Sequence, residues 1–136
     1  MTTQTSIRVL IADDHAVVRE GLRALIEAKP DMELIGEAED GVQAVLLARS
    51  LKPDVILLDL MMPRMDGFDF VRELRLRPEW RAVPVVVVTA KELTDEDRSR
   101  LQGLVSRVIQ KGALTRDDLL AEVRAVAGRA GKKNRE

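Results

Sequence analysis

A series of short apolar runs constrains the fold of this chain more than any other feature of its sequence. The runs cover residues 7–12, 55–58, 83–88 and, more weakly, 105–109, and a fifth candidate covers residues 33–38. The first four are too short for buried helices and too continuous for half-exposed strands. Runs rich in β-branched residues are typical of strands that are covered on both faces, as in a parallel sheet. The sequence therefore predicts five parallel strands.

Stretches with helical periodicity separate these runs. Three of them place apolar residues on one helix face and charged residues opposite. The three stripes are Val18, Leu22, Leu25 and Ile26; Val42, Val45 and Leu46; and Leu119, Leu120, Val123 and Val126. Capping-box-like patterns predict helix starts at Asp40, Thr94 and Thr115, and a further helix is predicted to open at Asp66 after the turn of residues 63–65. A strand followed by a helix, repeated five times, predicts an α/β fold: an open, doubly wound parallel sheet with right-handed crossovers and helices on both faces.

Composition is that of an ordinary globular protein. A length of 136 residues fits one domain, and a net charge of -1 creates no global field for nucleic acid or anionic lipid. The absence of cysteine excludes disulfides and thiolate metal sites. The N-terminus lacks the pattern of a signal peptide, and no apolar run is long enough to span a bilayer. We expect a cytoplasmic protein that binds neither membrane nor nucleic acid directly, with a folded domain over residues 1–127 and a flexible basic tail or linker over residues 128–136.

The carboxyl ends of the strands are the expected ligand site, because ligands bind there in sheets of this kind. Four strands end in polar or charged residues: Asp13 and Asp14 after the first, Asp59 after the third, Thr89 in the fourth and Lys111 shortly after the fifth. Glu37 lies near the end of the second strand, but an outer strand would hold it away from the others. Three carboxylates, a hydroxyl and an ammonium are thus expected to converge on one sheet edge.

The chemistry of this set points to phosphoryl transfer onto an aspartate. Three neighbouring carboxylates repel one another and attract a cation, and oxygen ligands favour Mg²⁺. A rigidly held Asp59 beside such a metal is suited to attack phosphorus, with Thr89 and Lys111 stabilising the phosphoryl oxygens. The backbone carbonyl of Met61 lies close enough in sequence to join the metal ligands.

The same residues also have purely structural interpretations. Asp13 and Asp14 are suited to cap the following helix. Asp59, Thr89 and Lys111 lie at strand ends and in loops, where polar residues are common. His15 is interpreted as an exposed helix-start residue, because Mg²⁺ disfavours imidazole. Trp80 is interpreted as a cover for the end of the third helix.

Four motifs between Ile7 and Val126 carry a family resemblance. They are V-L-I-A-D-D-H, L-L-D-L-M-M-P-R-M-D-G, V-V-V-T-A and V-I-Q-K-G. As a set with this spacing, they resemble the receiver domain of two-component response regulators. The resemblance implies a flavodoxin-like fold with strand order 2-1-3-4-5.

The resemblance also implies a role for each site residue. Asp59 would be the phosphoacceptor, Asp13, Asp14 and the Met61 carbonyl would help to hold Mg²⁺, and Thr89 and Lys111 would contact the phosphoryl group. The phosphoryl group would come from a sensor histidine kinase or a histidine phosphotransfer protein. Such a domain is not a conventional enzyme, because it catalyses only its own phosphorylation and dephosphorylation. It would signal to an output partner through the face of helix four, strand five and helix five, as a monomer or a homodimer.

Two residues depart from the family pattern. Val108 stands where many receivers have a Tyr or Phe that turns inward on activation, and Gly112 stands where a Pro is common. Residues 7–58 look like receivers that precede a helix-turn-helix DNA-binding domain, whereas residues 80–112 look more like receivers of hybrid sensor kinases. Drift within one family and an assembled chain both explain this difference.

Other functions fit the sequence less well. Phosphatases with an aspartyl nucleophile commonly carry a second Asp two residues later as general acid, where this chain has Met61. A flavin- or nucleotide-binding module is disfavoured because loop 13–16 is acidic and lacks glycine. A pseudo-receiver that binds partners without phosphorylation stays open, as does a receiver excised from a hybrid histidine kinase or a DNA-binding regulator.

Overall fold

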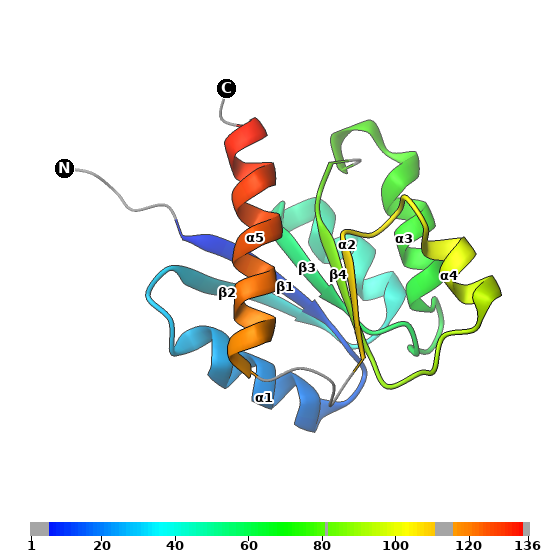
Figure 1. The fold of residues 1–136 in the computed structure, drawn as a ribbon, viewed down its shortest axis with the longest axis horizontal. Helices are drawn as coiled ribbons and strands as arrows, with labels where there is room; N and C mark the ends of the chain where they lie inside the picture. Colours follow the sequence, from blue (N-terminus) through cyan, green and yellow to red (C-terminus); the bar gives the residue numbers. More distant parts are fainter. Residues whose placement is uncertain (1–5, 81, 111–115, 135–136) are drawn as a thin grey trace.

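The computed structural model describes residues 6–80, 82–110 and 116–134, over which five strands and five α-helices alternate (Figure 1). The strands are β1 (Ile7–Ala12), β2 (Met32–Ala38), β3 (Val55–Leu58), β4 (Val85–Thr89) and β5 (Arg107–Gln110). The helices are α1 (Ala16–Glu27), α2 (Gly41–Leu51), α3 (Gly67–Leu76), α4 (Asp95–Leu101) and α5 (Arg116–Asn134), and a short 3-10 helix, η1 (Pro78–Trp80), follows α3. Among these helices, none combines the length and the apolar character that crossing a bilayer requires.

The strands form one parallel sheet in the order β2-β1-β3-β4-β5. This order confirms the predicted α/β fold and its flavodoxin-like topology. β1 and β3 begin and end where the sequence predicts. β4 begins two residues later than predicted, because the Val83 amide donates to the Trp80 carbonyl in the turn before the strand. β5 begins at Arg107, because the Val105 amide still bonds to the Leu101 carbonyl at the end of α4.

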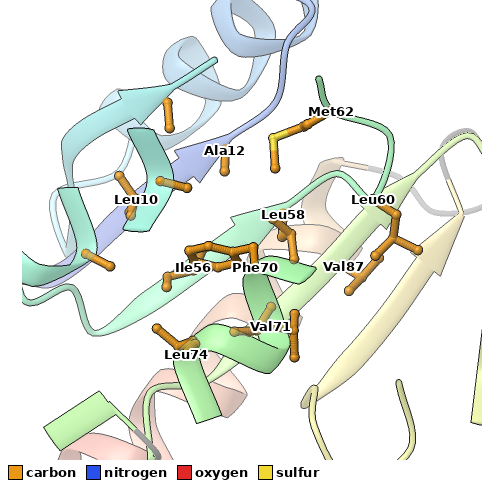
Figure 2. Packing of buried hydrophobic residues seen from close by; sticks show 14 of the residues in the cluster. Leu10, Ala12, Ile56, Leu58, Leu60, Met62, Phe70, Val71, Leu74 and Val87 are labelled. Carbon is orange, nitrogen blue, oxygen red and sulfur yellow. The ribbon is translucent and has the colours of Figure 1, made fainter. Parts of the chain in front are cut away.

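Successive residues of the central strands point to opposite faces of the sheet and divide the core in two. Leu10, Ile56 and Leu58 pack with Phe70 and Leu74 of α3 on one face, as Figure 2 shows. The other face joins the alternate strand residues to α1 and α5 (Figure 1). The predicted stripe of α5 is buried in that second cluster, at Leu119, Leu120, Val123 and Val126. β1 and β3 are therefore covered on both sides, which fixes their carboxyl ends rigidly.

The predicted apolar stripe of α2 is wrong in part. Val42 and Leu46 are 43% and 55% exposed, whereas Ala44 and Ala48 are buried against the sheet. The small residues face inward because α2 packs closely. A Cβ on Gly41 would lie 2.0 Å from the carbonyl oxygen of Met65, so only glycine fits at the start of the helix.

Three of the predicted helix starts are confirmed. The side chains of Asp40, Asp66 and Thr94 each accept a hydrogen bond from the backbone three residues on, and Thr94 forms a complete capping box with Asp97. The fourth predicted start, Thr115, lies outside the described residues. α5 runs through Asn134 and so extends into residues 128–136, the segment expected to be a tail. The division into a domain and a tail stays a prediction.

Candidate functional site

The parallel register brings the ends of β1 and β3 to one edge of the sheet. Ala12 pairs with Leu58, so Asp13 and Asp59 each follow the last residue of adjacent strands. The Asp59 amide donates to the Ala12 carbonyl at 2.9 Å, and the Asp13 amide donates to the Ala38 carbonyl at 3.0 Å. Both side chains are buried, with 3% of Asp59 and 2% of Asp13 exposed. Two carboxylates therefore leave the sheet edge from a fixed backbone.

Asp14 and His15 complete an acidic cluster with these two side chains. One potential ligand atom from each of Asp13, Asp14, His15 and Asp59 lies within 4.8 Å of the others. The Nδ1 atom of His15 is 3.0 Å from Asp14 Oδ1 and 3.2 Å from Asp13 Oδ1. Asp14 and His15 are exposed, whereas the other two members are buried, so the cluster opens to solvent on one side. The three predicted carboxylates are thus brought together.

This donor set fits a hard divalent cation. Mg²⁺ prefers oxygen ligands, binds one or two protein carboxylates and keeps several water molecules. Two buried carboxylates and one exposed carboxylate within a few ångströms supply such ligands, and the open side leaves room for water. Asp13, Asp14 and Asp59 are therefore suited to hold Mg²⁺.

His15 is the first residue flanking α1, as the sequence predicts. Its side chain is 61% exposed and makes no capping hydrogen bond to the helix. The alternative interpretation of Asp13 and Asp14 as caps is wrong, because His15 occupies the cap position. Asp13 Oδ1 instead accepts from the His15 amide at 2.9 Å, which orders the loop between β1 and α1.

Thr89 lies beside Asp59 at the end of β4. Its side chain is fully buried, and its hydroxyl donates to Asp59 Oδ1 at 3.1 Å. The Met61 amide donates to the same oxygen at 3.1 Å. These two bonds fix the orientation of the Asp59 carboxylate. The Met61 side chain is 54% exposed, so the residue reaches the site through its backbone.

β5 ends at the same edge, because Gln110 pairs with Thr89 in the ladder. Lys111 and Gly112, which follow it, lie outside the described residues. The role predicted for Lys111 therefore stays a prediction.

Lys91, for which no role is predicted from the sequence, lies next to the site. Its amide donates to the Thr89 hydroxyl oxygen at 3.2 Å, and its carbonyl accepts from the Gln110 side chain at 2.7 Å. Its ammonium donates to Asp97 Oδ2 at 2.7 Å. That bond and one from the Thr94 amide hold the pKa of the Asp97 carboxyl below its usual value. Lys91 lies only two residues after Thr89 in the sequence. That closeness is weak evidence for a contact, because the contact depends on how the loop folds.

Arg19 is a second residue without a predicted role. Its Nη1 donates to the Asp13 carbonyl at 2.7 Å, and its Nε lies 3.4 Å from Glu37 Oε1. Glu37 is outside the carboxylate cluster, as predicted, yet Arg19 connects it to the loop that carries Asp13. Two features of the sequence could have indicated this contact. Arg19 lies one helical turn after the acidic loop, and Glu37 lies near the end of the neighbouring strand.

Comparison with known proteins places this chain in a large family. A family model described as "Response regulator receiver domain" matches residues 9–124. The transcriptional regulatory protein LiaR of Bacillus subtilis is 45% identical over 109 residues, which are 80% of this chain and 47% of that protein. The chain thus spans about half the length, or less, of the first curated relatives it matches.

Solved structures show the same architecture. The response regulator domain of Thermotoga maritima CheB has a TM-score of 0.80 at 29% identity, with 90% of this chain and 97% of that chain covered. The receiver domain of a sensor histidine kinase from Pseudomonas aeruginosa has a TM-score of 0.79 at 26% identity, covering 91% and 99% of the two chains. Its structure contains a magnesium ion coordinated in the active-site cleft.

Proposed function

Because this chain belongs to the response regulator receiver domain family, we propose that Asp59 is the phosphoacceptor through which it acts as a switch in two-component signalling. The observation that carries the proposal is the placement of Asp59. Its carboxylate is buried at the end of a central strand, bonded to the Thr89 hydroxyl at 3.1 Å, and grouped with Asp13 and Asp14. A nucleophile held in this way needs little reorganisation before it reacts.

In the proposed reaction an oxygen of Asp59 attacks the phosphorus of a phosphohistidine. The new bond joins that oxygen to phosphorus, the bond from phosphorus to the histidine nitrogen breaks, and the nitrogen keeps the electron pair. Asp13, Asp14, Asp59 and the Met61 carbonyl would hold Mg²⁺, which would supply positive charge to the phosphoryl oxygens. The magnesium ion in the P. aeruginosa receiver supports this assignment. The chain catalyses only its own phosphorylation and dephosphorylation and is not a conventional enzyme.

Thr89 and Lys111 would then contact the phosphoryl group. The Thr89 hydroxyl would exchange its bond to Asp59 for one to a phosphoryl oxygen, while Lys111 would add a second positive charge. Because the Thr89 oxygen also accepts from the Lys91 amide, this exchange alters the loop after β4.

The output partner would bind on the face formed by α4, β5 and α5. A hollow of about 410 Å³ lies there between α4 and β5, and Val108, which is 37% exposed, forms part of its wall. Val108 stands at the position where many receivers carry an aromatic ring. The phosphoryl donor would be a sensor histidine kinase or a histidine phosphotransfer protein. The chain would act in the cytoplasm, as a monomer or a homodimer, without binding nucleic acid or membrane directly. Its folded domain would end near residue 127.

The test is the mass of the intact protein after incubation with acetyl phosphate, with and without Mg²⁺. We expect wild type to gain one phosphoryl group in a Mg²⁺-dependent manner and Asp59→Asn to gain none. Asp69→Asn is the matched control, because Asp69 lies in the first turn of α3, half-exposed and outside the cluster.

Two results would contradict the proposal. An acid-labile phosphoryl group on folded Asp59→Asn would exclude Asp59 as the acceptor. No gain by folded wild type from acetyl phosphate or from a phosphorylated histidine phosphotransfer domain would favour the alternative, a pseudo-receiver that binds partners without phosphorylation.

A further inference from the structure

The side chain of Arg19 joins the acidic loop after β1 to the end of β2. Arg19 lies one turn into α1, and only 13% of its side chain is exposed. Its Nη1 donates to the Asp13 carbonyl at 2.7 Å, and its amide donates to the His15 carbonyl at 3.0 Å. One residue therefore binds both ends of the three-residue segment that carries Asp13 and Asp14.

The guanidinium of Arg19 is itself held in place. Its Nε lies 3.4 Å from Glu37 Oε1, and its Nη2 lies 3.4 Å from Glu39 Oε1. The other carboxylate oxygen of Glu37 accepts from Arg23 Nε at 2.8 Å. An ordered chain of contacts thus runs from Arg23 through Glu37 and Arg19 to the Asp13 backbone.

This support matters because the loop lacks the usual helix cap. His15, at the cap position of α1, makes no side-chain bond to the helix. The conformation of the loop depends instead on the Asp13 side chain, which bonds the His15 amide, and on Arg19, which bonds the Asp13 carbonyl. The backbone conformation at Asp13 and Asp14 determines where their carboxylates lie.

We propose that Arg19 is a positioning residue for divalent-cation binding, which it supports through the Asp13 carbonyl without touching the cation. The inference rests on the proposed function, in which Asp13 and Asp14 hold Mg²⁺. Groups that orient metal ligands typically contribute about 10–100-fold to metal affinity. Arg19→Met therefore weakens Mg²⁺ binding by about tenfold or more.

The direction in which Arg19→Met changes Mg²⁺ affinity distinguishes a positioning role from long-range electrostatics. Arg19→Met removes a positive charge near a cluster of carboxylates, and by charge alone this tightens the binding of a cation. Loss of positioning weakens it. Arg23→Met is the matched control, because Arg23 lies one turn further along α1 and contacts the same Glu37, while its described hydrogen bonds do not reach Asp13.

The experiment titrates ¹⁵N-labelled wild type, Arg19→Met and Arg23→Met with MgCl₂ and follows the backbone amide resonances of Asp14 and His15. We expect affinity to fall about tenfold or more in Arg19→Met and to change less than about twofold in Arg23→Met. Thermal unfolding without Mg²⁺ gives each variant's stability separately. Arg19→Lys provides the same test if Arg19→Met does not fold, because one ammonium keeps the charge but cannot bond both Asp13 and Glu37 as the guanidinium does.

Two results overturn the inference, and they are distinguishable. Mg²⁺ binding by Arg19→Met that equals or exceeds that of wild type shows that Arg19 does not position the loop, while the metal site itself stands. Absence of any saturable Mg²⁺ response in wild type refutes the metal site of the proposed function, and the inference falls with it.

Discussion

We expect the Arg75→Met variant to unfold at a markedly lower urea concentration than the wild-type protein. The Arg75 side chain reaches from α3 to three backbone carbonyls: Nε donates to Leu104 at 2.8 Å, and Nη1 donates to Val83 at 2.8 Å and to Trp80 at 3.2 Å. These carbonyls belong to the α4–β5 connection, the turn before β4 and the end of η1. One side chain thus joins α3 to the α4–β5 connection and to the turn between η1 and β4.

The magnitude follows from these bonds and from the cost of burying the guanidinium. A hydrogen bond from a charged donor contributes about 1.5–3 kcal/mol, so three give a gross value of about 5–9 kcal/mol. Burial opposes this gain, since it disfavours the charged form and lowers the pKa of Arg75. Methionine keeps the apolar stem, and water can reach part of the carbonyl surface after the substitution. A net loss of about 3 kcal/mol in the free energy of unfolding is therefore expected.

Urea unfolding followed by far-ultraviolet circular dichroism measures this loss directly. The matched control is Arg72→Met on the same helix, where the Arg72 side chain is 63% exposed and pairs with Asp69 at 3.1 Å. An exposed pair of this kind contributes about 0.2–0.5 kcal/mol. If Arg75→Met and Arg72→Met unfold at the same urea concentration with equal slopes, the three carbonyl bonds do not stabilise the fold and the reasoning is wrong.

Two further predictions concern glycines in α1 and α3 and the ion pair between Lys91 and Asp97 in α4. Gly67→Ala should destabilise the protein by about 1–3 kcal/mol, because the added Cβ would lie 2.6 Å from the Leu60 Cα. Gly21→Ala, with open space around its Cβ, should stabilise the protein by up to about 1 kcal/mol. If urea unfolding showed that the two substitutions change the free energy of unfolding equally, the packing argument would be contradicted. The pKa of Asp97 is lowered from 3.8, chiefly by Lys91, so its stabilising contribution is present above that pH and lost as pH falls through the folded-state pKa. Unfolding midpoints of wild type and Lys91→Met should therefore differ at neutral pH and converge in acid, and a constant difference would exclude this linkage.

The strands could be predicted from the sequence because burial on both faces leaves a direct signal. β1 and β3 have continuous apolar character and end where that character ends. The inward face of α2 could not be predicted in this way. Hydrophobic periodicity gives weight to large side chains such as Val42 and Leu46, whereas close packing selects Gly41 and Ala44.

The carboxylate cluster could be predicted because a parallel ladder places strand ends in register. Asp13 and Asp59 need only follow adjacent strands to meet at the sheet edge. The contacts that support the cluster depend instead on the reach of long side chains across loops. The bond from Arg19 to the Asp13 carbonyl, for example, forms only because the loop between β1 and α1 turns that carbonyl toward the arginine.

The hydrogen bonds around Thr89 link Asp59 to α4 and β5. The Thr89 hydroxyl donates to Asp59 and accepts from the Lys91 amide, so a change at one bond alters the geometry of the other. Lys91 in turn bonds Gln110 at the end of β5 and Asp97 in the first turn of α4. If Asp59 is phosphorylated as proposed, the exchange of the Thr89 bond from Asp59 to a phosphoryl oxygen would act on the Lys91 amide and, through Lys91, on its contacts to both elements. These contacts give the chain a polar route from Asp59 to the α4 and β5 face, although Val108 provides no aromatic ring there.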